Sequence, residues 1–87
     1  MTYRVFKYRL EIADRQQIKI PVRNRPLYIG IDPSRELCLW AEVDAGSPEH
    51  LVDVFVHGTG HEIMGDTYLG SAVQHPCVWH VYWGKRK

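Results

Sequence analysis

Apolar and polar residues alternate through most of the chain, and this alternation predicts β-strands rather than helices. Residues 3–12 show it most clearly, because Phe6 and Tyr8 fall on one face while Lys7 and Arg9 fall on the other. A sustained period of two is typical of a half-buried strand. Further strands are expected at residues 17–22, 27–31, 37–43, 51–57, 68–73 and 77–83.

The number and spacing of these segments predict the fold class. About seven short strands separated by turn residues are typical of a small antiparallel β sandwich or open barrel, so we expect an all-β fold. Residues 23–26 are expected to form a loop and residues 63–66 a turn. Residues 1–87 are predicted to form a single domain in which residues 84–87 are a mobile tail.

Two sequence features predict where individual strands lie in a sheet. Pro21 has no backbone N–H to donate, which favours an edge position for the strand at residues 17–22. The segments at residues 37–43 and 77–83 are apolar on both faces. Such strands are central in their sheet, or a partner covers their second face.

Large aromatic residues lie on strands whose opposite face is already apolar. These residues are Trp40, Phe55, Trp79, Tyr82 and Trp83. A single small core covers one face of such a strand, so a homodimer or higher oligomer, or an aromatic-lined binding surface, is predicted to cover the other. The alternative is that all of these rings pack within one core.

Composition and charge narrow the classes of function. The chain has 87 residues, 45% of them hydrophobic, and a net charge of +1. This basic excess is too small for a typical duplex-binding domain, so no duplex nucleic acid is expected as a partner. Arginine and lysine residues still cluster between residues 15 and 25, which leaves room for a small basic pocket that binds an anion.

The chain carries no apolar leader and no run long enough to span a membrane, so a cytoplasmic protein without a membrane partner is expected. Its two cysteines, Cys38 and Cys77, lie in apolar strands and do not form a CxxC pair. We therefore expect both thiols to stay reduced.

Several sequence blocks together carry a family resemblance. In chain order they are Lys7-Tyr8-Arg9-Leu10, Pro21, Leu39-Trp40-Ala41, Gly58-Thr59-Gly60-His61, Tyr68-Leu69-Gly70 and Val78-Trp79-His80-Val81. With these blocks the chain resembles the DUF7352 type, a family of small proteins found in bacteriophages and prophages. Members of that family usually continue Gly-Thr-Gly-His with proline, where this chain has Glu62. The resemblance covers nearly the whole chain and implies a viral setting, hence the host cytoplasm, but no activity.

The block Gly58-Thr59-Gly60-His61 is the main candidate site. Two glycines around a threonine allow the backbone N–H groups to converge on one point, as in nests that bind phosphate or carboxylate. In this hypothesis Arg23 or Arg25 reaches in from a neighbouring loop or subunit, and Trp40 or Trp79 stacks on a base. The alternative is a structural corner, in which glycine relieves crowding at the end of a strand.

Metal and catalytic sites have less support. His57, His61 and His80, with Asp53 or Glu62, contain the ligand types for zinc, but no standard ligand spacing is present, so no metal site and no cofactor are predicted. No catalytic residues are assigned, because the chain shows neither a Ser-His-Asp order nor paired carboxylates.

Two classes of function remain. In the first, the protein is a phage accessory protein that acts by binding, either a nucleotide-derived immune signal of the host or a host defence protein. In the second, it is a structural or assembly protein of the phage whose aromatic face serves oligomerisation. A small metal-dependent hydrolase is the third and weakest interpretation.

Overall fold

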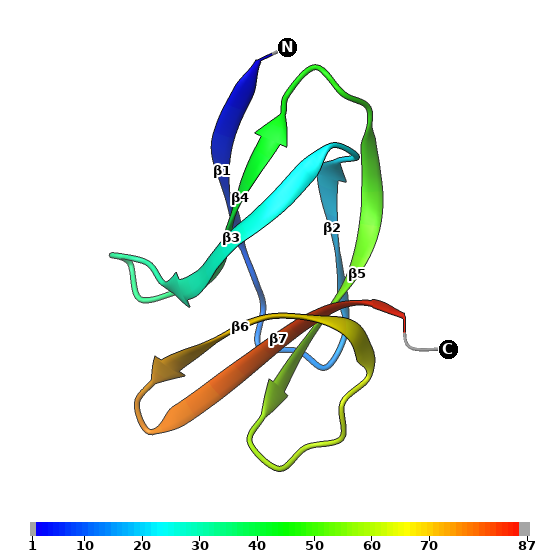
Figure 1. Cartoon of the computed structure of the whole chain (residues 1–87). Helices are drawn as coiled ribbons and strands as arrows, with labels where there is room; N and C mark the ends of the chain where they lie inside the picture. Colours follow the sequence, from blue (N-terminus) through cyan, green and yellow to red (C-terminus); the bar gives the residue numbers. More distant parts are fainter. Residues whose placement is uncertain (1, 86–87) are drawn as a thin grey trace.

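The computed structural model describes residues 2–85 and consists of two packed β-sheets (Figure 1). Its strands are β1 (Tyr3–Arg9), β2 (Gln16–Pro21), β3 (Asn24–Ile31), β4 (Leu37–Asp44), β5 (Glu49–Gly58), β6 (Gly65–Gln74) and β7 (Cys77–Lys85). Sheet A has the order β1-β4-β3 and sheet B the order β2-β5-β7-β6, with all pairs antiparallel. The predicted all-β fold is therefore confirmed, as an open sandwich rather than a closed barrel.

Strand β5 connects the two halves of sheet B. Up to Val54 it pairs with β2, and from Val54 to Gly58 it pairs with β7. The β6–β7 hairpin thus lies across the second half of β5, and β6 packs against β3 of sheet A (Figure 1). The loop that follows β5 is consequently next to β7.

The core lies between the two sheets and takes alternate residues from each strand. In β4, Leu39 and Ala41 are fully buried on the face toward sheet B. In β7, Val81 is fully buried in the same cluster, and Trp79 and Trp83 pack against it. Both tryptophans of β7 therefore contribute to the core of this chain.

The predicted strand positions agree with the observed topology. Strand β2, which ends at Pro21, is an edge of sheet B. Strands β4 and β7, whose sequences are apolar on both faces, are central in their sheets. The missing N–H of proline and the two-sided apolar pattern were thus reliable indicators of position.

Several strand boundaries differ from the prediction. Asn24 to Pro26 belong to β3 rather than to a loop, and the β3–β4 register shifts just after Pro26, which accommodates a proline in an edge strand. β6 begins at Gly65, within the predicted turn, and β7 continues to Lys85, into the predicted tail. Residues 86 and 87 of that tail lie outside the described part of the chain.

Candidate functional site

The loop between β5 and β6 folds back over the outer face of sheet B. Gly65, at its end, lies so close to the sheet that an added Cβ would overlap the Cβ of Tyr82 and lie 3.1 Å from Cδ2 of Phe55. The N–H of Met64 donates a hydrogen bond of 3.2 Å to Nε2 of His57. Phe55 and His57 are each only 2% exposed, so the chain itself covers these outer-face rings.

The Gly58-Thr59-Gly60-His61 segment forms a tight turn at the end of β5. The N–H of His61 donates to the carbonyl oxygen of Gly58 at 3.1 Å, and Gly60 has a φ of +92°. A positive φ at the third position, with this hydrogen bond, is the arrangement of a type II turn and favours glycine. The His61 amide is thus used within the turn. Among the described residues, no backbone hydrogen bond from a turn or loop engages the amides of Thr59 and Gly60.

A chain of short hydrogen bonds connects this turn to the sheet. Thr59 Oγ1 lies 2.8 Å from Nε2 of His80, and Nδ1 of His80 lies 2.7 Å from Oγ of Ser71. Ser71 Oγ in turn lies 2.6 Å from the hydroxyl of Tyr68. His80 and Ser71 are direct partners in the β6–β7 pairing, which explains their contact. Both ring nitrogens of His80 are therefore held by hydroxyl groups, and the turn is tied to β7.

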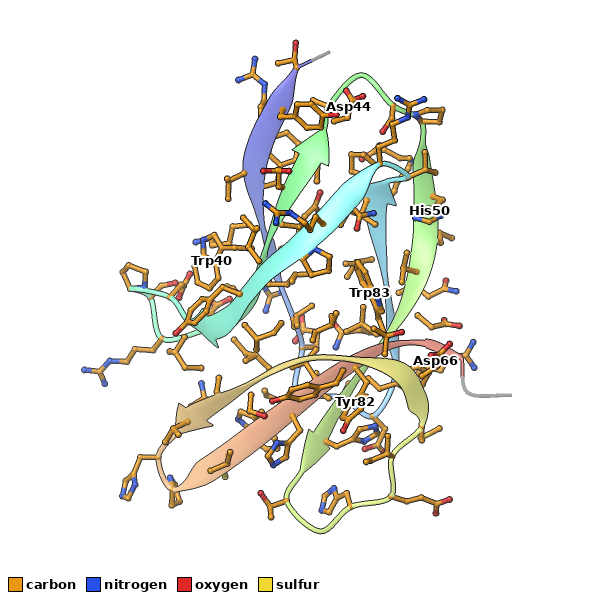
Figure 2. All side chains as sticks on the ribbon, viewed as in Figure 1. Trp40, Asp44, His50, Asp66, Tyr82 and Trp83 are labelled. Carbon is orange, nitrogen blue, oxygen red and sulfur yellow. The ribbon has the colours of Figure 1, made fainter. Side chains whose placement is uncertain are left out.

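Loop and sheet together enclose a pocket of about 230 Å³. Its wall consists of His57, Gly58, Thr59, Gly60, His61, Ile63, His80 and Tyr82. Figure 2 shows Tyr82 near the β5–β6 loop. The centroid of its ring is 6.0 Å from that of the His57 ring. The pocket thus combines three imidazoles and the ring of Tyr82 with the hydroxyl of Thr59 and a glycine turn.

His57 enters this pocket as a neutral ring. Burial is the main cause that lowers the pKa of His57, and the nearby carboxylate of Asp14 opposes this effect. Its Nε2 accepts the hydrogen bond from Met64, so the proton of the neutral imidazole resides on Nδ1. His57 can therefore serve as a structural acceptor for the loop, while positive charge in the pocket has to come from elsewhere.

Over residues 1–87 the chain matches the protein family described as Domain of unknown function (DUF7352). The chain belongs to this family. Comparison of this DUF7352 domain with curated proteins and with solved structures gives no match. The family has no described function, so the chemistry of the site has to be inferred from its geometry.

The structure brings together five of the residues predicted for the site of this DUF7352 domain. Gly58, Thr59, Gly60 and His61 line the pocket. Trp79 lines two adjoining hollows of about 330 and 380 Å³, both of which also include Gly58 and His61. Its indole N–H donates to Oε1 of Gln74 at 2.9 Å, which fixes the ring orientation.

The other three predicted residues lie elsewhere in this chain. Arg25 pairs with Glu42 at 3.4 Å on the outer face of sheet A, and Trp40 packs there against Tyr28 with centroids 5.7 Å apart. The carbonyl of Arg23 accepts a hydrogen bond from Asp44, next to the beginning of β5 rather than its end. Within one subunit these residues do not join the pocket.

Sequence reasoning did not assign several pocket residues to the site. The sequence offers His57 and His80 as possible zinc ligands, His80 also as a core or interface histidine, and Tyr82 as an interface aromatic. Ser71 and Tyr68 lie outside the pocket wall and are connected to it by the hydrogen-bond chain. The signal that unites them is the register, in which His57 pairs with His80 and Tyr68 with Tyr82. Alternation shows which residues share a face of one strand, but it does not show which strands are neighbours.

Three further findings bear on the chemistry. No group of three or more histidine, cysteine, aspartate or glutamate residues within residues 2–85 is arranged to hold a metal ion. No helix in that part of the chain is long and apolar enough to cross a membrane. Cys38 and Cys77 are both free, and Cys77 is exposed rather than buried.

Proposed function

We propose that this protein binds a small anionic, nucleotide-derived ligand at the pocket beneath the β5–β6 loop and leaves it chemically intact. The main observation in support of this proposal is the chain of hydrogen bonds that ends at Thr59 in the wall of the pocket. The pocket is smaller than the roughly 300–1,000 Å³ typical of sites for drug-sized ligands. We infer that it holds the phosphate, and that the rest of the ligand extends across His61 toward Trp79.

The direction in which the hydrogen bonds between Tyr68 and Thr59 are donated decides which ligand the pocket favours. If the Tyr68 hydroxyl donates to Ser71 and Ser71 donates to Nδ1 of His80, then Nε2–H of His80 donates to Thr59. The Thr59 hydroxyl then has its own proton available for an acceptor in the pocket. Hydrogen bonds that point in one direction polarise one another, which strengthens the last donor. Binding of an anion therefore favours this direction of the hydrogen bonds.

The remaining donors suit a phosphate. The amides of Thr59 and Gly60 are the central amides of the turn, and amides near one point bind anions without a full positive charge. His61 also lines the pocket and adds an imidazole N–H to these donors.

The arrangement of His80 supports binding rather than hydrolysis. In a nucleophilic triad, a carboxylate orients the histidine while the other ring nitrogen activates the nucleophile. Here both nitrogens of His80 contact hydroxyls, and the Ser71 hydroxyl is shared with Tyr68. The histidine is thereby fixed as a relay for hydrogen bonding.

The resemblance to phage proteins supplies the biological setting of the proposal. A viral protein that binds a nucleotide-derived signal in the host cytoplasm would sequester it and weaken the host response. The alternative is a role in phage assembly or in binding a host defence protein, in which the pocket has no small ligand. Titration with ligands distinguishes these functions.

The test uses calorimetry and NMR titration with inorganic phosphate, AMP, ADP-ribose and cyclic dinucleotides. Thr59→Val should weaken binding about tenfold or more, because one hydrogen bond to a charged group is lost. Thr67→Val is the matched control, since Thr67 is exposed on β6 and contacts Asp66 outside the pocket. Tyr68→Phe should weaken binding less than Thr59→Val, because it removes only the first donor of the chain. Absence of binding by every probe, or equal affinities in Thr59→Val and Thr67→Val, would refute the proposed function.

A further inference from the structure

Strand β1 has a partner on one side only, and its unpaired edge can be identified residue by residue. The N–H of Leu10 donates to the carbonyl of Leu37 at 2.8 Å, continuing the β1–β4 pairing beyond Arg9. Backbone groups of successive strand residues point to opposite sides. Even-numbered residues of β1 therefore bond to β4, and the N–H and C=O groups of Val5, Lys7 and Arg9 face the other edge. No other strand of the described chain pairs there.

The other edge strands of residues 2–85 carry features that hinder pairing with another molecule. β2 ends in Pro21, β3 contains Pro26 and a register shift, and β6 has a register shift between Tyr68 and Gly70. Prolines and bulges are established means of protecting sheet edges. β1 has neither, and it pairs with β4 in an unbroken register from Tyr3 to Arg9.

Ion pairs neutralise two of the three cations on β1. Lysine at an edge usually opposes pairing because two copies would repel each other. Here Nζ of Lys7 lies 2.8 Å from Asp32, and Arg9 contacts Glu11 at 2.6 Å and Glu36 at 3.1 Å. These ion pairs compensate the charges of Lys7 and Arg9 and leave only that of Arg4 on β1.

We propose that β1 pairs antiparallel with β1 of a second copy of this chain, with the two-fold axis at Phe6. In this register Phe6 lies opposite Phe6, Val5 opposite Lys7, and Arg4 opposite Tyr8. No like charges lie directly opposite each other in this register. A register centred on Lys7 would instead place two lysines face to face.

The proposed pairing also covers apolar surface. Val5 is 59% exposed and Phe6 is 38% exposed in the single chain. The two sheets A, each of three strands, would join into one continuous sheet of six strands. Because β1 belongs to sheet A and the pocket to sheet B, this inference is independent of the proposed ligand.

The first test is disulfide trapping in a Cys77→Ser background, which removes the exposed native thiol. A pair at the two-fold axis that does not exchange backbone hydrogen bonds has Cα atoms about 4.5 Å apart, within the range of a disulfide. Phe6→Cys should therefore form a covalent dimer readily under mild oxidation. Arg4→Cys, on the same face of β1, is the matched control. In the proposed register Arg4 lies opposite Tyr8 of the second copy, so the two substituted positions are too far apart to form a disulfide. Equal cross-linking of the two variants would overturn the proposed register.

The second test is sedimentation velocity of the full chain over a concentration series. The wild type should dimerise, and Val5→Pro should raise the dissociation constant about tenfold or more, because it removes an edge-facing N–H from each copy. Val5→Thr keeps this N–H and should dimerise like the wild type. A wild-type monomer at about 100 µM would refute the proposal. If Val5→Pro does not fold, the cysteine variants still decide the question.

Discussion

Gly65→Ala tests whether the β5–β6 loop is held on sheet B by close backbone packing. The added methyl group would overlap the Cβ of Tyr82 and lie 3.1 Å from the ring of Phe55, so the loop or the sheet must move. Inserting a methyl group into a well-packed site costs about 1–3 kcal/mol. For a domain of this size, each kcal/mol lowers the Tm by roughly 4–8 °C. We therefore expect the Tm of Gly65→Ala to fall by about 10 °C.

The assay is thermal unfolding followed by circular dichroism, together with the ligand titration. Gly46→Ala is the control, because its Cβ would meet only Asp44 Oδ1 at 3.5 Å, an ordinary contact. Its Tm should stay within about 2 °C of the wild type. If Gly65→Ala behaved in the same way, the loop would not be packed on Tyr82 as described. If Gly65→Ala lost much of its stability but kept its ligand affinity, the packing of the loop would matter for folding and not for ligand binding.

Three further outcomes follow from the structure. The pKa of His57 lies below its ordinary value of 6.5, so as the pH falls the unfolded chain takes up a proton before the folded chain does. The stability of the protein should therefore decrease below about pH 6.5. Urea unfolding of His57→Gln should show a weaker decrease over this range. Gly60→Ala should lose about 1–2 kcal/mol in urea unfolding through backbone strain alone, because φ is +92° and nothing lies within 4 Å of the added Cβ; an unchanged stability would contradict this φ. Cys77 should react with iodoacetamide in the native protein, whereas Cys38, which is 0% exposed and whose thiol pKa is raised by burial, should react only on unfolding; equal rates by mass spectrometry would refute this.

The strands were predictable because their period is a property of the local sequence. Leu39 and Ala41 alternate with Trp40 along β4, and the structure places the first two in the core and Trp40 on the outer face. The edge position of β2 followed from the chemistry of Pro21 alone. Boundaries were less predictable, since Pro26 lies within β3, next to a register shift, where a loop was predicted.

The covering of the outer face was not predictable from periodicity. The sequence predicts an interface at Phe55 and Tyr82, because the opposite faces of their strands are already apolar. The loop that covers Phe55 carries no alternation, and its contact depends on Gly65 approaching Tyr82. Phe55 therefore needs no second subunit to bury it, whereas a homodimer stays a prediction, for which the β1 edge gives a separate argument.

The site was predicted to the extent that it is local in sequence. Residues 58–61 form the turn that lines the pocket, whereas Arg25 and Trp40 lie on the other sheet. Nothing in a single sequence assigns strands to one sheet or the other, so neighbours across the sandwich could not be foreseen. His80 lies in the site because β7 pairs with β5 so that His80 is opposite His57, and the sequence alone does not show this pairing.

The two proposals together determine what a second subunit can add to the pocket. In sheet A the order is β1-β4-β3, so a dimer joined through β1 places β3 at the outside of the combined sheet. Arg25 of β3 is then farthest from the partner and keeps its ion pair with Glu42 in its own chain. The earlier hypothesis that Arg25 reaches the pocket of a neighbouring subunit is incompatible with this dimer. Ligand affinity should therefore be the same in Arg25→Ala as in the wild type. A clear loss of affinity in that variant would show that the subunits meet through a surface other than the β1 edge.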